Sequence, residues 1–94
     1  MNQQQWVLHL YVAGRALGLS RQAETNLRKL CDQHLQGRYR IQVIDLAEEP
    51  GLAREHQVTA VPMVVRIEPP PFRKIVGTLG SEAGALLQLD TPIA

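Results

Sequence analysis

Apolar residues are grouped along the chain in stretches that glycine, proline and charged residues separate. Residues 6–12 are almost continuously apolar, with His9 as the clearly polar exception, which is typical of a strand covered on both faces. After Ser20, apolar residues recur at helical spacing. The Ser20 hydroxyl is expected to cap this helix by accepting a hydrogen bond from a first-turn N–H group, and Gly37 is expected to end it. The apolar stripe consists of Ala23, Leu27, Leu30, Cys31 and Leu35.

Residues 39–46 are the second predicted strand. A strand, a helix of about 16 residues and another strand make up a βαβ unit, whose crossover is right-handed almost without exception. Acidic residues followed by Pro50 then favour the start of a short helix, because both are favourable in a first turn. This helix is expected to end near His56 or Gln57.

The last third of the chain predicts two further strands and a helix. Pro62 precedes a third strand at residues 63–67, where its missing N–H group costs least. A run of three prolines forms a stiff connector to a fourth strand at residues 73–76. Ser81 is expected to cap a last helix. That helix would dock its apolar residues Leu86, Leu87 and Leu89 on the sheet.

This order of elements, βαβ–α–ββ–α, predicts an α/β fold of the thioredoxin-like type, a three-layer sandwich in one domain over residues 1–94. A redox member of that class would carry a Cys-x-x-Cys pair just after the first strand, whereas residues 14–20 contain no cysteine. Pro62 stands where thioredoxin-like domains have a cis proline, so we expect a cis peptide bond there. A thioredoxin-like fold without the redox cysteine pair predicts a module that acts by binding.

Composition and charge narrow the function classes. An apolar content of 45% and a charged content of 20% are ordinary for a globular domain. A net charge of +1 gives no field that would favour nucleic acid. One cysteine fits a reducing compartment. With neither a signal-peptide pattern nor an apolar run of roughly 20 residues, a cytoplasmic protein away from membranes is expected.

Few residues carry the pattern of a catalytic or metal site. Cys31 lies late on the apolar stripe of the first helix, so a structural role is expected for it. The three histidines match no metal-ligand spacing, and His9 is expected to be a hydrogen-bonded packing residue. We therefore predict no catalytic residues, no cofactor and no metal.

The residues after the proline run are candidates for binding a partner and not for catalysis: Phe72, Arg73 and Lys74. Two cations beside a strand are often only solvated surface. With an apolar ring next to them, they are also what a module would present to an acidic partner. They are the candidate partner-binding residues.

Several segments of the chain resemble the KaiB family of circadian-clock proteins, in register from about residue 8 to about residue 90. They are Leu10-Tyr11-Val12-Ala13-Gly14, Asn26-Leu27 with Leu30-Cys31, Gly37-Arg38-Tyr39, Val43-Ile44-Asp45-Leu46, Pro50-Gly51-Leu52-Ala53, Ala60-Val61-Pro62 and Pro69-Pro70-Pro71-Phe72-Arg73-Lys74-Ile75-Val76-Gly77.

The resemblance implies a non-enzymatic regulator. KaiB proteins bind the KaiC ATPase ring and recruit or sequester other clock components. It therefore implies a KaiC-like ATPase ring as the partner and further clock or signalling proteins as second partners, in a circadian or a stress-signalling role. Docking would use the edge of the second strand and the loop around Phe72, Arg73 and Lys74.

KaiB proteins also adopt a second fold, which rearranges the C-terminal half and self-associates. The family usually has glycine and then aspartate in its final apolar segment, where this chain has Gln88 and Asp90. Glutamine exceeds glycine in helix propensity by roughly 0.5 kcal/mol. These two positions are therefore the candidates that shift the balance towards the thioredoxin-like form.

Two alternative functions remain open. A thiol-dependent, thioredoxin-like oxidoreductase would need Cys31 to be exposed and ionised at neutral pH. A sensory domain like that of the SasA-type histidine kinase has the same thioredoxin-like unit.

Overall fold

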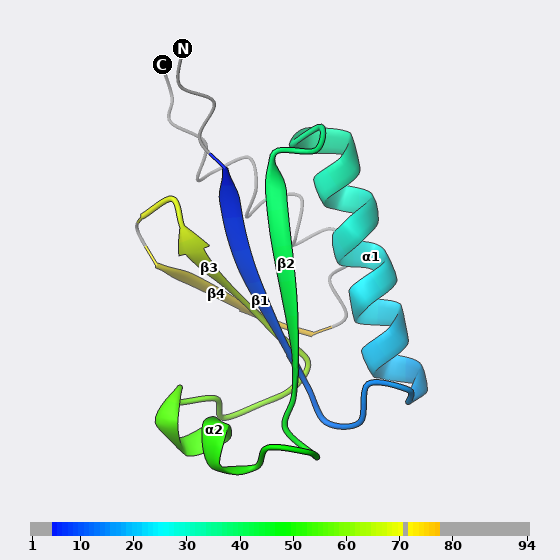
Figure 1. Cartoon of the computed structure of the whole chain (residues 1–94). Coiled ribbons are helices and arrows are strands. Elements are labelled where there is room, and N and C mark those ends of the chain that lie inside the picture. Colours follow the sequence, from blue (N-terminus) through cyan, green and yellow to red (C-terminus); the bar gives the residue numbers. More distant parts are fainter. Residues whose placement is uncertain (1–4, 71, 78–94) are drawn as a thin grey trace.

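Four strands and two helices form the described part of the chain, residues 5–70 and 72–77 of the computed structural model (Figure 1). In chain order they are β1 (Trp6–Val12), α1 (Gly18–His34), β2 (Tyr39–Asp45), α2 (Gly51–Glu55), β3 (Met63–Glu68) and β4 (Arg73–Val76). The predicted order is confirmed over these residues, and β1 and β4 have the predicted bounds. The last predicted helix, from Ser81, lies outside the described residues, as do Gln88 and Asp90.

The strands form one mixed sheet in the order β2-β1-β3-β4. β1 and β2 run parallel, in register from Trp6 opposite Tyr39 to Val12 opposite Asp45, so α1 is the crossover helix of a βαβ unit. β3 pairs antiparallel with β1 and with β4. β1 and β3 are therefore the central strands, whereas β2 and β4 each leave one edge unpaired within the described sheet.

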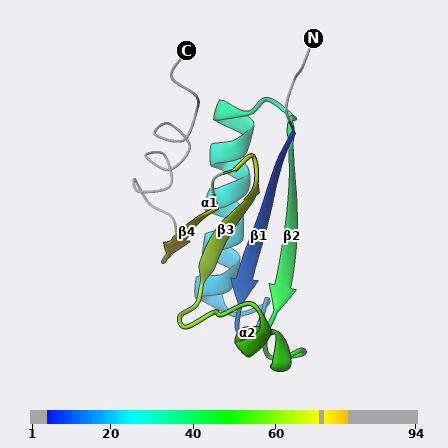
Figure 2. The same ribbon diagram turned by 90° about the vertical axis from the view of Figure 1, so that its left-hand side faces the viewer.

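The larger core lies between the sheet and α1, which covers one face of the sheet (Figure 2). Alternate residues of a strand point to the same face, so β1 contributes every second side chain to this core. From α1, the residues at i, i+4 and i+8 face the sheet, as the apolar stripe predicts. Its buried members are Trp6, Leu8, Leu10, Val12, Ala23, Leu27, Cys31, Leu35 and Val64.

A smaller core lies on the opposite face of the sheet. Its buried members are Tyr11, Ile44, Met63 and Val65. Leu52 of α2 and Val58, which follows α2, pack against them. Because α2 has only five residues, it covers one end of this face (Figure 2).

The predicted N-cap of α1 is wrong. The helix begins at Gly18, with Leu17 as an extended N-cap residue that makes no side-chain cap hydrogen bond. Ser20 lies inside the first turn and is only 5% exposed. It occupies the same helix face as Ala23 and Leu27, so it lies on the sheet-facing side.

Other element ends differ by a residue or two from the predictions. The C-cap of α1 is Leu35, and Gly37 lies two residues beyond it with a φ of 84°. α2 ends at Glu55 with His56 as its C-cap, one residue before the nearer of the two predicted ends. β3 is one residue longer than predicted and carries an irregularity opposite Val7 and Leu8 of β1.

Arg66 of β3 was not singled out by the sequence pattern, although its side chain is fully buried. Its guanidinium lies 5.2 Å from the centroid of the Trp6 ring. Such a cation–π contact is the arrangement in which an arginine can pack on an apolar core.

Candidate functional site

The predicted partner-binding residues lie at the β4 edge of the sheet. Phe72 is 57% exposed, and Arg73 and Lys74 are exposed as well. The Lys74 ammonium lies 5.9 Å from the centroid of the Phe72 ring, so the ring and the charge are presented together.

Arg73 and Lys74 point to opposite faces of the sheet, since neighbouring residues of a strand alternate. Lys74 pairs with Val65, which belongs to the smaller core. Arg73 pairs with Arg66, which stacks on Trp6 on the α1 face. The two cations therefore project from opposite faces of the sheet at its β4 edge.

The other predicted docking element, the β2 edge, lies on the far side of the sheet. Two strands, β1 and β3, separate β2 from β4. At the usual spacing of strands, the two edges are roughly 14 Å apart. One partner can therefore contact both edges only by covering a whole face of the sheet.

The loop that carries the redox pair in thioredoxin-like enzymes is held by Asp45 here. The N–H groups of Gly14 and Arg15 donate to its carboxylate at 2.8 and 2.9 Å, and Ala47 N–H donates at 3.0 Å. The hydrogen bonds from Arg15 and then Gly14 lower the pKa of Asp45. Gly14 has a φ of 88°, and a Cβ there would approach the Leu17 side chain to 2.9 Å. The end of β2 thus fixes this loop, which contains no nucleophilic cysteine.

The Val61–Pro62 peptide bond, which lies beside this loop, is cis, as expected. The Glu68–Pro69 peptide bond is also cis, which the sequence did not predict. Leu17 and Val61 are exposed beside Pro62 and line an apolar hollow with it.

Cys31 does not meet the requirement of the oxidoreductase alternative. Its side chain is fully buried in the larger core, among residues of α1 and the sheet. Burial, with a smaller contribution from Asp32, raises the pKa of this thiol to about 12. A thiol that is covered and un-ionised at neutral pH cannot act as a nucleophile.

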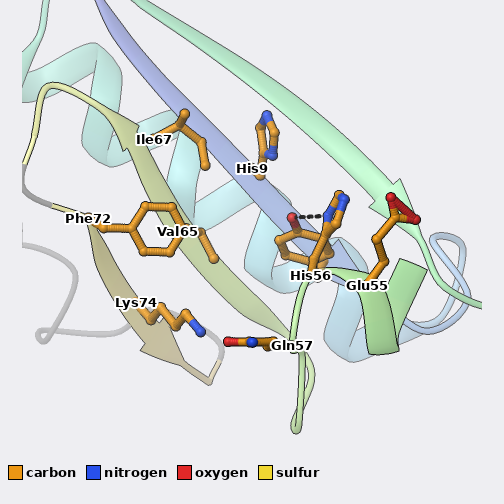
Figure 3. Close-up of a pocket in the computed structure, with 9 residues that line it drawn as sticks. His9, Glu55, His56, Gln57, Val65, Ile67, Phe72 and Lys74 are labelled. Carbon is orange, nitrogen blue, oxygen red and sulfur yellow. Dashed lines mark hydrogen bonds between the residues drawn. The ribbon is translucent and has the colours of Figure 1, made fainter. Parts of the chain in front are cut away.

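A cavity of about 380 Å³ opens on the sheet face opposite α1, between the end of α2 and β4 (Figure 3). Phe72 and Lys74 line it, so two of the three predicted residues meet here. The other lining residues are His9, Tyr11, Glu55, His56, Gln57, Val65 and Ile67. The nine lining residues come from four separate parts of the chain, namely β1, the end of α2, β3 and the start of β4, so no local sequence pattern indicates the cavity.

Two histidines and a tyrosine meet in this cavity. The Tyr11 hydroxyl and Nδ1 of His56 form a 2.6 Å hydrogen bond. The Tyr11 ring packs edge-to-face with His56 and with His9, with ring centroids 5.6 and 6.2 Å apart. The expectation for His9 is wrong, because its Nδ1 is buried and has no hydrogen-bond partner among the described residues.

Residues 5–70 and 72–77 contain neither a cluster of metal-binding side chains nor a membrane-spanning helix. No group of three or more histidine, cysteine, aspartate or glutamate side chains there is placed to hold a metal ion. Neither described helix is long and apolar enough to cross a membrane.

Sequence comparison matches the chain to one family. The KaiB domain family model matches residues 9–90. The circadian clock oscillator protein KaiB of Trichodesmium erythraeum is 41% identical over 85 residues, which is 90% of this chain and 81% of that protein.

Structural comparison matches the fold to the thioredoxin-like class. The N-terminal domain of SasA from Synechococcus elongatus has a TM-score of 0.78 at 20% identity, over 97% of this chain and 90% of that domain. Mitochondrial thioredoxin 3 of Saccharomyces cerevisiae has a TM-score of 0.70 at 23% identity, over 92% and 79% of the two chains. The predicted α/β, thioredoxin-like fold is therefore confirmed.

Proposed function

The chain belongs to the KaiB family of circadian clock proteins, and on that basis we propose that it is a non-enzymatic regulator that docks on a KaiC-type ATPase ring. The docking surface consists of Phe72, Arg73 and Lys74 at the β4 edge. Docking there would modulate the ATPase in circadian or stress signalling.

The exposed ring of Phe72 is the observation that carries this proposal. Large apolar side chains flanked by arginine are typical anchors of protein interfaces. More than half of the Phe72 side chain is exposed, and a cation lies over its ring. The partner that fits is an acidic surface with an apolar hollow, which would cover the ring and pair with the cations.

The proposal that the chain is not an enzyme rests on the loop after β1 and on Cys31. Asp45 fixes that loop by backbone hydrogen bonds, and the loop presents no cysteine. The thiol that the chain does have is buried, with its pKa raised to about 12. A regulator that acts by binding needs neither group to be reactive.

The β2 edge is free for a second contact in this arrangement. It lies roughly 14 Å from the β4 edge, so a ring that docks at β4 leaves accessible those backbone groups of β2 that are unpaired within the described sheet. We assign this edge to a second clock or signalling protein, which can bind by strand pairing.

The test is co-migration with a KaiC-type ATPase ring in size-exclusion chromatography. The variant Arg73→Glu/Lys74→Glu should lose co-migration, because it reverses both charges of the docking surface. Phe72→Ala should weaken it by removing the anchor. The matched control Arg21→Glu/Lys29→Glu makes the same change of charge at exposed positions of α1 and should bind as the wild type does.

Circular dichroism of each variant shows whether the fold is intact. Unchanged co-migration of the β4 variant would refute the docking surface. Equal loss in the β4 and α1 variants would refute it too, since only net charge would then matter.

A further inference from the structure

The cavity behind Phe72 has the size and the mixed lining of a small-molecule site. At about 380 Å³ it lies within the usual range of ligand pockets, roughly 300–1,000 Å³. Val65 and Ile67 of β3 form an apolar floor, and Phe72 forms one wall. Figure 3 shows Phe72 and Lys74 on one side, with His56 and Gln57 across from them. An apolar group of a ligand would contact the floor and the Phe72 ring.

The Tyr11–His56 hydrogen bond indicates which nitrogen of His56 carries its proton. Burial raises the pKa of Tyr11, so its hydroxyl keeps its proton at neutral pH and can donate it to Nδ1 of His56. A neutral imidazole that accepts at Nδ1 carries its proton on Nε2. No protein partner is seen for Nε2 of His56 among the described residues.

His9 supplies a second donor by similar reasoning. His9 lines the cavity, and its Nδ1 is buried without a partner among residues 5–70 and 72–77. Burying an unpaired lone pair is less unfavourable than burying an unpaired N–H group, so the proton is assigned to Nε2. Burial and then His56 lower the pKa of His9, so its ring is neutral at pH 7.

The remaining charged and polar groups around the cavity add to an excess of donors. Lys74 of β4 carries an ammonium group, and its side chain points towards the amide of Gln57 (Figure 3). Glu55 is the acidic member of the described lining, and its carboxylate lies beyond His56, at the far end from Lys74 (Figure 3). The lining therefore contributes an ammonium group and two imidazole rings, which calls for a ligand with acceptor oxygens.

We propose that this cavity binds a small carboxylic acid with an aromatic or branched apolar group. The carboxylate would accept hydrogen bonds from Lys74 and from the imidazoles of His9 and His56, and the apolar group would lie between Phe72 and Ile67. This inference goes beyond docking on an ATPase ring and does not depend on it, because binding is a property of the isolated chain.

The probe is phenylacetate, titrated into ¹⁵N-labelled protein and followed by NMR. Saturable shifts are expected at His9, Tyr11, His56 and Lys74. A charge-assisted hydrogen bond is worth about 1.5–3 kcal/mol, so phenylacetamide, which lacks the charge, should bind at least about tenfold more weakly. Acetate, which lacks the ring, should also bind at least about tenfold more weakly, because it leaves the apolar floor uncovered.

Lys74→Gln removes the ammonium group and should weaken phenylacetate binding by at least about fivefold. The matched control Arg73→Gln removes a charge from the next residue, on the opposite face, and should change binding by less than about twofold. Both positions are exposed, so neither substitution threatens the fold.

The pH dependence gives an independent readout. A carboxylate beside the His9 imidazole favours the charged ring, so phenylacetate should raise the pKa of His9 and bind more tightly at about pH 6 than at about pH 8. Any one of four results would overturn the proposal. Phenylacetamide could bind as tightly as phenylacetate, or the two glutamine variants could weaken binding equally. The pKa of His9 could stay unchanged on binding, or phenylacetate could cause no saturable shift. If the wild-type chain binds phenylacetate but does not co-migrate with a KaiC-type ring, only the proposed docking function is refuted.

Discussion

The burial of Cys31 makes a quantitative prediction about its reactivity. Only the thiolate reacts with an alkylating reagent such as iodoacetamide. At pH 8, a thiol with a pKa of about 12 is ionised in roughly one molecule in 10⁴, whereas an ordinary thiol, with a pKa near 8.5, is roughly one-quarter ionised. The ionised fraction alone therefore slows labelling of the native protein by roughly three orders of magnitude relative to the unfolded chain. Exclusion of the reagent from the core slows it further.

Transient unfolding does not remove this difference. With a free energy of unfolding of about 5 kcal/mol, the unfolded fraction is roughly 10⁻⁴, and a more stable chain exposes the thiol less. Labelling through the unfolded state is then slower than labelling in denaturant by a similar factor.

The assay compares labelling rates in buffer and in urea at the same pH, with mass spectrometry as the readout. A control variant, Cys31→Ala/His34→Cys, places the thiol on the exposed side of the last turn of the same helix. It should label in buffer at close to the unfolded rate. A native Cys31 that labels within about tenfold of the unfolded chain would refute the burial argument and restore the oxidoreductase alternative.

Two further predictions concern stability. Leu27 lies in the larger core at 2% exposure, so Leu27→Ala should lower the free energy of unfolding, measured in urea, by about 3 kcal/mol. Leu19 is 63% exposed on the same helix, so Leu19→Ala should change it by less than about 0.5 kcal/mol. Equal effects of the two substitutions would contradict the assignment of the sheet-facing side of α1. The lowered pKa of Asp45 means that its stabilising contribution is present above about pH 4 and is lost as the pH falls through the folded-state value, so the urea midpoint should decrease at acid pH. Asp45→Asn should flatten this acid dependence, and a profile identical to that of the wild type would count against the carboxylate's role in holding the loop.

The sequence predicted the elements whose pattern is local. β1 has the predicted bounds because it is a nearly continuous apolar run that ends just before Ala13-Gly14, and β4 because it lies between the proline run and Gly77. Cys31 was predicted to be buried because the helical period alone places it beside Leu27 on the sheet-facing side.

The start of α1 was not predicted correctly, because Ser20 satisfies the local pattern of an N-cap. The sheet overrides that pattern: the position lies over the sheet, so the residue is buried inside the first turn and the helix extends back to Gly18. Local propensity is weak compared with the burial of a whole helix face.

The cavity could not be read from the sequence for a different reason. Its residues share no spacing, and His9 and His56 are brought together only by the packing of the end of α2 against β1. Each residue looks ordinary on its own. That Nδ1 of His9 is buried without a partner in the described part of the chain becomes visible only once the surrounding atoms are placed.

The positions of the cations on the two outer strands also bear on how copies of this chain avoid aggregation. An unpaired strand edge is a template for pairing with any other edge, and charged side chains are a common protection against it. β2 exposes Arg40, and β4 exposes Arg73 and Lys74. Two copies that approach edge to edge would thus bring like charges together, whereas an acidic surface meets no such repulsion. The residues proposed to attract a partner would also keep neighbouring copies from joining into a continuous sheet.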